Sequence, residues 1–280
     1  MADWDKLSGS GNIDDRRMYG PVMGGIGSFG AMGIVALVVA NLLGVDPGLT
    51  SDIMNQLAQS QAQRQTTGPS EFDGKDSYEA FTSKVLGSTN DTWTGIFEQS
   101  GTAYREPRLV LFRGATASGC GGATSSSGPH YCPADETIYL DETFFDELTK
   151  QLGAKGGDVA QAYVIAHEVG HHVQQQLDLL NETERARDAE AARAVSIKLE
   201  LQADCFAGVW LYAVNQQGIL EPGEITEARD AAAAVGDDHI QQTTSGRVTP
   251  ENWTHGSSAE RAWWFNRGYQ SGQPSQCQTF

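Results

Sequence analysis

The sequence predicts an α+β protein that is mostly helical with a small sheet and is preceded by one N-terminal transmembrane helix. Three observations support this fold class. Residues 18–45 carry no charge, runs of β-forming residues stand at 108–112 and 137–140, and helical spacing of apolar residues dominates after residue 157. The chain of 280 residues is long enough for one well-buried domain with appendages.

The first element is an apolar, glycine-rich segment, and we expect residues 22–45 to form a transmembrane anchor. Its core at 26–45 can cross about 30 Å of hydrocarbon at a rise of about 1.5 Å per residue. Arg16 and Arg17 precede the segment, and Asp46 follows it. The positive-inside rule therefore places the N-terminus in the cytoplasm and the rest of the chain outside, as a single-pass protein of the cell membrane with an extracytoplasmic domain.

This interpretation divides the chain into a cytoplasmic tail at 1–21, the anchor at 22–45, a polar linker at 46–75 and a domain at 76–280. A cleaved signal peptide is a rival interpretation. It fits less well because the apolar run continues past the passable cleavage triplet at 38–40, and because the region before the run is acidic. A buried helix of a soluble protein is the remaining alternative.

The spacing of apolar residues predicts the other elements. We expect, in chain order, a helix at 76–97, strands at 108–112 and 137–140, a helical piece at 144–152, a helix that holds the run 158–174, a helix within 183–216, a helix at 222–242 and an aromatic core helix at 257–272.

The charge balance argues against nucleic acid as a partner. The net charge is −17 at pH 7 and the pI is near 4.6, so no basic patch is available to replace counterions on a phosphate backbone. The same balance disfavours adsorption to anionic lipid surfaces. It is only a weak indication of a basic substrate, since acidic surfaces also keep proteins soluble.

The run His-Glu-Val-Gly-His-His at 167–172 predicts a metal site. His167 and His171 are four residues apart, so on a helix both imidazoles lie on one face and can share one Zn²⁺ ion. Glu168 directly follows the first ligand, where it can act as general base on a water activated by the metal. The apolar residues at 159–166 indicate a buried helix, on which charged groups need a reason. A core helix with satisfied histidines is the alternative.

Two further residues of this run carry information. His172 lies about 100° around the helix from His171. It is therefore expected to pack in the interior rather than to bind the same ion. Gly170 costs a helix about 1 kcal/mol relative to alanine, which suggests the close approach of another backbone.

A catalytic zinc ion needs a third protein ligand and an open fourth position. Glu200 and Asp204 are spaced four residues apart on a predicted helix whose following residues are mostly apolar. We assign Glu200 as the third ligand. Asp204 is expected to orient a ligating histidine through its other ring nitrogen. The alternative is that both are solvated acids on the helix surface.

The run His-Glu-x-Gly-His-His-Val-Gln, followed by Glu-Leu-Gln-Ala-Asp-Cys-Phe-Ala-Gly-Val-Trp, resembles the neutral zinc metallopeptidase family of membrane-anchored bacterial proteins. Its Glu-x-x-Ala-Asp arrangement is also similar to that of gluzincins, in which the Glu binds the metal and the Asp supports a ligand. The resemblance covers roughly residues 1–280 and is weakest between about 46 and 75. It implies a zincin-like metallopeptidase domain with one Zn²⁺ ion and leaves the substrate open. Further matching stretches lie at 108–112, 118–121, 128–135, 138–141, 254–258 and 276–280.

In the peptidases that the chain resembles, a strand at the edge of the cleft pairs with extended substrate, and 137–140 is our candidate for it. The developing oxyanion also needs a hydrogen-bond donor. His255 is the first candidate because it stands at a predicted helix start outside the main motif. His239 is a second candidate, and His130 with Tyr131 is a third.

Four cysteines, an even number, are consistent with two disulfides, and three pairings are possible. A bridge between Cys120 and Cys132 would close a Gly/Ser-rich loop. A bridge between Cys205 and Cys277 would pin the C-terminal tail to the metal-bearing helix. Free buried thiols are the alternative.

Three functions compete at this point. The leading one is a membrane-anchored zinc peptidase that acts on a peptide or protein substrate through Glu168. The second is a zinc-dependent amidase on a cell-wall amide, which would use the same chemistry. The third is a membrane-anchored interaction domain whose zinc is structural and whose fourth coordination site is closed.

Overall fold

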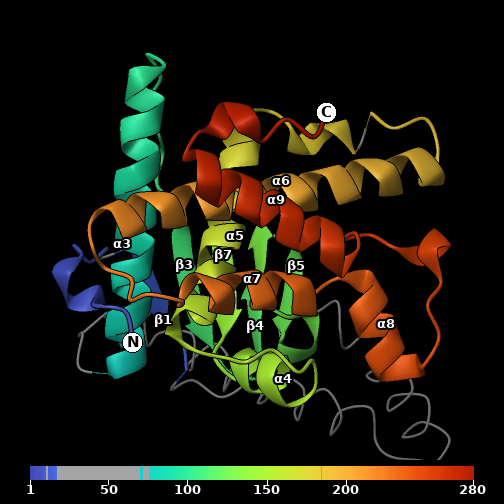
Figure 1. The fold of residues 1–280 in the computed structure, drawn as a ribbon, viewed down its shortest axis with the longest axis horizontal. Helices are drawn as coiled ribbons and strands as arrows, with labels where there is room; N and C mark the ends of the chain where they lie inside the picture. The colour runs from blue at the N-terminus through green and yellow to red at the C-terminus, as the bar shows by residue number, and fades with distance from the viewer. Residues whose placement is uncertain (11, 18–69, 72–75, 184) are drawn as a thin grey trace, which may run out of the picture.

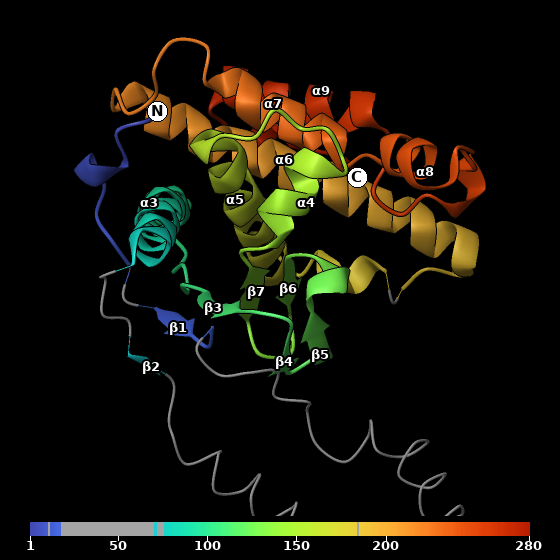
Figure 2. The same ribbon diagram turned by 90° about the horizontal axis from the view of Figure 1, so that it is seen from below.

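The computed structural model describes residues 1–10, 12–17, 70–71, 76–183 and 185–280. Its strands form one five-stranded sheet in the order β2-β1-β3-β7-β6 and a separate two-stranded hairpin, β4-β5. Figure 2 shows the long helices gathered on one side of this sheet. The strands are β1 (Ile13–Asp15), β2 (Ser70–Glu71), β3 (Arg108–Phe112), β4 (Ala115–Ser118), β5 (Gly121–Thr124), β6 (His130–Cys132) and β7 (Thr137–Asp141).

The two strands predicted from the sequence form the centre of the sheet. β3 and β7 run parallel in the register Val110 to Tyr139, and Leu109, Val110 and Leu111 are fully buried. One expectation is wrong: the segment 137–140 is not an edge strand. β7 lies between β3 and β6, which occupies the outer position and pairs antiparallel with β7. Hydrogen bonds on both sides therefore leave β7 no free edge for a substrate.

The described residues form seven α-helices, which pack on one another and against the sheet (Figure 1). The segment predicted as one helix at 222–242 forms two helices, α7 and α8. Gly236 separates them, and a Cβ atom there would lie 2.3 Å from the backbone nitrogen of Ser258. The helices are α3 (Ser77–Gln99), α4 (Phe144–Lys150), α5 (Asp158–Gln176), α6 (Ala189–Gln216), α7 (Ile225–Ala234), α8 (Asp237–Ser245) and α9 (Ser258–Ser271).

Glycines bring α5, α6 and α9 unusually close together. A Cβ atom on Gly170 of α5 would lie 3.0 Å from the Cα atom of Ala203 on α6. Gly268 of α9 lies against the carbonyl oxygen of Cys205, at a spacing that excludes any side chain. The close approach expected at Gly170 is therefore confirmed, and it joins the two helices that carry the motif residues. α9 is also less buried than predicted, because Phe265 is fully buried but Trp263 is 54 % exposed.

The N-terminal residues belong to the same domain as the helices. Trp4 is buried and donates a hydrogen bond from Nε1 to Asp158 at the start of α5, at 2.7 Å. β1 pairs in parallel with β3. A strand cannot share a sheet with the rest of a domain across a membrane, so the division into a cytoplasmic tail at 1–21 and an outside domain at 76–280 is wrong.

The predicted membrane anchor is corrected as well. Across the residues that the structure describes, no helix combines the length and the apolar character that a membrane crossing requires. The fold class is therefore mixed helix and sheet, and the N-terminal transmembrane helix and the single-pass location in the cell membrane are not supported. Residues 22–45, on which that prediction was made, lie outside the described residues, as does most of the predicted linker at 46–75.

Two disulfides hold loops to the core. Cys120, in the turn between β4 and β5, is bonded to Cys132 at the end of β6. Cys205 of α6 is bonded to Cys277 in the C-terminal tail. Of the three pairings that the sequence allows, the structure has this one, and no described cysteine is free.

Candidate metal centre

Three side chains from two helices converge on one point. His167 and His171 lie on α5, and Glu200 lies on α6. Glu200 Oε2 is 3.2 Å from His167 Nε2, and Glu200 Oε1 is 3.4 Å from His171 Nε2. All three ligand atoms lie within 4.8 Å of one another. Bonds of about 2.0–2.2 Å in a tetrahedral arrangement place ligand atoms about 3.4 Å apart, so this donor set fits Zn²⁺.

The protein environment prepares these groups to attract a cation. Burial by itself lowers the pKa of His167, but hydrogen bonds to Asp204 and Glu200 raise it to about 10. Burial by itself raises the pKa of Glu200, but the nearby His171 and His167 hold that pKa well below its ordinary value. Glu200 is therefore a buried anion. A bound metal cation would take the place of the histidine protons that otherwise balance its charge.

Asp204 supports the first histidine of the motif. It is fully buried, and its Oδ1 lies 2.9 Å from Nδ1 of His167. Since a carboxylate oxygen accepts, His167 donates from Nδ1 and keeps the lone pair of Nε2 for a metal ion. The structure thus places Asp204 where the sequence predicted it, while its role in metal binding stays a prediction.

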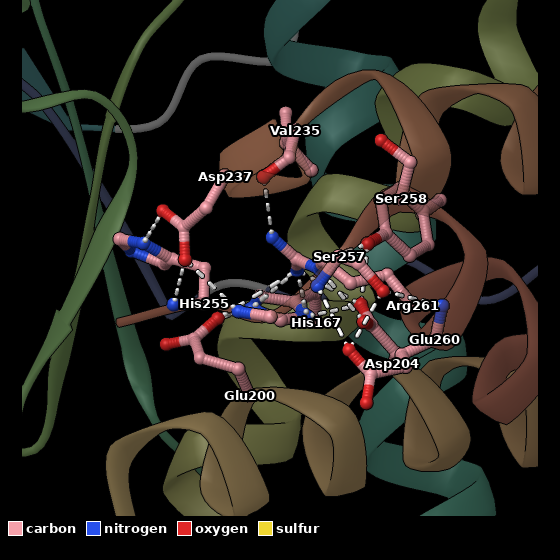
Figure 3. Close-up of polar contacts among 12 residues, drawn as sticks. His167, Glu200, Asp204, Val235, Asp237, His255, Ser257, Ser258, Glu260 and Arg261 are labelled. Carbon is pink, nitrogen blue, oxygen red and sulfur yellow. Dashed lines mark hydrogen bonds and ion pairs between the residues drawn. The ribbon is translucent and has the colours of Figure 1, made fainter. Parts of the chain in front are cut away.

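Arg261 of α9 is a residue of this site that the sequence analysis missed. Its guanidinium donates to both oxygens of Asp204, at 2.8 and 2.9 Å, and to the carbonyl oxygen of Val235 at 3.1 Å. Figure 3 shows Arg261 in contact with both Asp204 and His167. Tyr163 adds a hydroxyl that donates to Asp204 at 2.5 Å. Burial by itself raises the pKa of Asp204, but Arg261 holds it below the ordinary value.

Glu168 stands apart from this network. It lies beside the first ligand, is only 6 % exposed and lines the same cavity. It forms no hydrogen bond or ion pair with any other residue that the structure describes. Its carboxylate is therefore available to a water or substrate in the cavity, which is what a general base requires.

The cavity has a volume of about 520 Å³. Its wall includes the polar side chains His167, Glu168, His171 and Glu200, together with apolar side chains from several helices and strands. His130 and Tyr131 belong to the edge strand β6, so the cavity extends from the two motif helices to the edge of the sheet. The lining residues are 127–131, 144, 152, 163, 164, 167, 168, 171, 180, 196, 199, 200, 235, 240, 255 and 261.

The candidates for an oxyanion donor are placed differently by the structure. His255 lines the cavity, with Nδ1 3.3 Å from Asp237 Oδ1, as drawn in Figure 3. His239 instead contacts the carbonyl oxygen of Leu152 at 2.7 Å and does not line the cavity. Of these two histidines, only His255 lines the cavity.

The third candidate is the pair His130 and Tyr131 of β6. His130 and Tyr131 both line the cavity, and the hydroxyl of Tyr131 also lies 3.0 Å from Nδ1 of His172. His172 is fully buried, and its Nε2 contacts the carbonyl oxygen of Arg105 at 2.5 Å. The expectation that His172 packs in the interior is confirmed, and burial lowers its pKa.

Comparison with known proteins agrees with this geometry. Residues 2–280 match the family described as "Putative neutral zinc metallopeptidase", and the chain belongs to that family. It is 45 % identical over 289 residues to the uncharacterized protein YpfJ of Escherichia coli (strain K12), covering 99 % of this chain and 98 % of that protein. It is 43 % identical over 257 residues to the uncharacterized protein Mb2605 of Mycobacterium bovis, covering 86 % and 85 %. No solved structure matches the chain.

Proposed function

We propose that this protein is a zinc-dependent peptidase that hydrolyses peptide bonds in the cavity between α5, α6 and β6. One observation carries the proposal: His167, His171 and Glu200 converge within 4.8 Å, and Glu168 faces the same cavity without a protein partner among the described residues. A purely structural metal site needs no unpaired carboxylate beside the metal. Membership of a zinc metallopeptidase family supports the same conclusion.

The residues of the cavity divide the chemistry among them. A zinc ion held by the three ligands would act as a Lewis acid toward water and the scissile carbonyl group. Glu168 accepts the proton of the attacking water and delivers it to the leaving amine. His255 faces Asp237 with Nδ1, which donates to that carboxylate; when the ring is protonated on both nitrogens, its Nε2–H can donate to the carbonyl oxygen as negative charge develops there.

The substrate backbone is proposed to lie along β6 rather than β7. β6 is the outer strand of the sheet formed by the described residues, and residues 128–131 line the cavity. An extended peptide can pair with such a free edge through main-chain hydrogen bonds. This arrangement brings a peptide carbonyl to the metal ligands without a requirement for a particular side chain.

The proposal is tested by replacing Glu168 with glutamine in the full chain. Glu168→Gln is expected to retain one zinc ion per chain and to lose cleavage of casein and of fluorogenic peptides by about 10²- to 10⁴-fold, because the base is lost and the ligands remain. Metal analysis and peptidase assays measure the two effects. His171→Ala should lose both zinc and activity.

Glu190→Gln, which changes an exposed acid on α6, is the matched control and should behave as the wild type. A folded wild type without zinc would overturn the site assignment. Zinc without cleavage of any peptide would overturn the peptidase assignment. An amidase would use the same residues, so a cell-wall amide belongs in the substrate panel.

A further inference from the structure

The second metal histidine is supported in a different way from the first. His171 has no carboxylate behind it. Its Nδ1 lies 2.9 Å from Oε1 of Gln174, three residues later on α5. Gln174 is fully buried. The function proposed above assigns no role to this glutamine, although it belongs to the run that defines the motif.

The contacts of Gln174 determine which way its amide group faces. Its Nε2 donates to the carbonyl oxygen of Leu199 at 2.7 Å and to Oε1 of Gln202 at 3.1 Å. A main-chain carbonyl oxygen can only accept, so the atom that faces Leu199 must be the amide nitrogen. The oxygen of Gln174 therefore faces His171, which must donate from Nδ1 and keep Nε2 for the metal ion.

The same argument applies one step further along the chain of hydrogen bonds. Gln202 of α6 is 6 % exposed, and its Nε2 donates to the carbonyl oxygen of Cys277 at 2.8 Å. The oxygen of Gln202 therefore faces Gln174. Cys277 is held in place by its disulfide to Cys205, and both cysteines are buried. A backbone carbonyl of the C-terminal tail thus ends a buried chain of hydrogen bonds that begins at a metal ligand.

We propose that Gln174 and Gln202 are positioning residues for His171, and that the Cys205–Cys277 disulfide anchors them through the Cys277 carbonyl group. The inference rests on the zinc site of the proposed function. The two glutamines set the tautomer and the ring orientation of His171, and they do so without adding charge. The two histidine ligands therefore differ: His167 faces an ionised carboxylate, and His171 faces a neutral amide.

Zinc affinity, measured by competition with a chromophoric chelator, tests this proposal without any assay of activity. Gln174→Met keeps the volume of the side chain and removes the acceptor, so zinc affinity should fall about 10- to 100-fold. Gln174→Glu keeps an oxygen that can accept from His171, so its zinc affinity should be closer to that of the wild type than the affinity of Gln174→Met is. The absorption spectrum of bound Co²⁺ should change in Gln174→Met, because the orientation of a ligand changes.

Gln176→Met is the matched control on the same helix. Gln176 hydrogen-bonds the backbone of Arg105, outside this chain of contacts, so the control should bind zinc as the wild type does. Wild-type affinity in Gln174→Met, or an equal loss in Gln176→Met, would overturn the proposal. A folded wild type that binds no zinc would instead remove the proposed function.

The anchoring role of the tail has its own test. Gln202→Met and the pair Cys205→Ser with Cys277→Ser should each weaken zinc binding less than Gln174→Met, because Leu199 still orients Gln174. The pair Cys120→Ser with Cys132→Ser removes the other disulfide and should leave zinc affinity unchanged. If the variant without the Cys205–Cys277 disulfide bound zinc as tightly as the variant without the Cys120–Cys132 disulfide, the C-terminal tail would not support the metal site. If Gln174→Met fails to fold, Gln202→Met and the two double-cysteine variants still test whether this chain of hydrogen bonds supports zinc binding.

Discussion

At the scale of single residues, the site depends on buried groups that each have several partners. Asp237 is an example outside the metal ligands. It is 8 % exposed and accepts the backbone N–H groups of Thr254, His255 and Gly256 at 2.8, 2.6 and 3.0 Å. One carboxylate thus shapes the loop that brings His255 to the cavity, and three donors depend on its negative charge.

Replacing Asp237 with asparagine should lower the free energy of unfolding by about 1.5–3 kcal/mol at pH 7, because charged acceptors are lost. Burial by itself raises the pKa of Asp237, but its bonds to His255 and the backbone hold it below the ordinary 3.8. Its contribution is therefore complete above about pH 4 and disappears as the pH falls through the lowered pKa.

Urea unfolding of the metal-free protein at pH 7 and near pH 3 measures this difference. The stability difference between wild type and Asp237→Asn should be smaller near pH 3 than at pH 7. Asp146→Asn is the control, since the side chain of Asp146 is 73 % exposed and pairs only with Lys150 among the described residues. It should change the stability at pH 7 by less than about 0.5 kcal/mol. A difference that persists unchanged in acid would contradict the assignment to ionised Asp237.

At the scale of elements, the spacing of α5 and α6 sets the geometry of the proposed metal site, because the three candidate ligands are divided between the two helices. Gly170→Ala would place a Cβ atom 3.0–3.2 Å from three atoms of Ala203. The helices must separate by a few tenths of an ångström, so we expect a loss of about 1–3 kcal/mol in stability and weaker zinc binding. Thermal unfolding and chelator competition measure both.

Gly95→Ala provides the matched comparison. Gly95 lies near the C-terminal end of α3, and nothing stands within 4 Å of an added Cβ atom. The better helix propensity of alanine should then raise the stability by about 0.5–1 kcal/mol. If Gly170→Ala stabilised the protein as Gly95→Ala does, the contact between α5 and α6 could not be what requires glycine there.

At the scale of the whole molecule, the described residues on either side of the segment 18–69 lie close together. Asp15 of β1 pairs with Ser70 of β2, and Arg17 forms ion pairs with Asp76 and Glu142 at 3.0 and 2.7 Å. The described residues of 1–17 and 76–280 therefore share one sheet and one core.

Replacing 18–69 with a short Gly-Ser connector should shift the unfolding temperature by less than about 4 °C, because the strand pairings and ion pairs that join residues 13–17 to the rest of the described domain remain. Removing 1–17 should instead cost more than about 3 kcal/mol, since Trp4 and β1 are lost from the core. Circular dichroism during heating compares the two variants with the full chain. A large loss in the first variant, or none in the second, would contradict this division of the molecule.

The sequence by itself determined the features that depend on local periodicity. Four-residue spacing on helices placed His167 and His171 together, and it did the same for Glu200 and Asp204. The central strands were predicted for a similar reason, because β-forming residues are contiguous. Hydropathy alone misled us for the N-terminal region, since it does not register that residues on both sides of an apolar run can join one sheet.

Only the tertiary structure decided which distant residues meet. Arg261 reaches Asp204 across 57 positions, and Gln202 reaches Cys277 across 75. No periodicity links such pairs, because they depend on how whole helices pack. The order of the strands, which makes β6 rather than β7 the edge, depends on packing in the same way. Local spacing thus predicted the proposed metal ligands, and long-range packing determined which groups contact them and which strand forms the edge of the sheet.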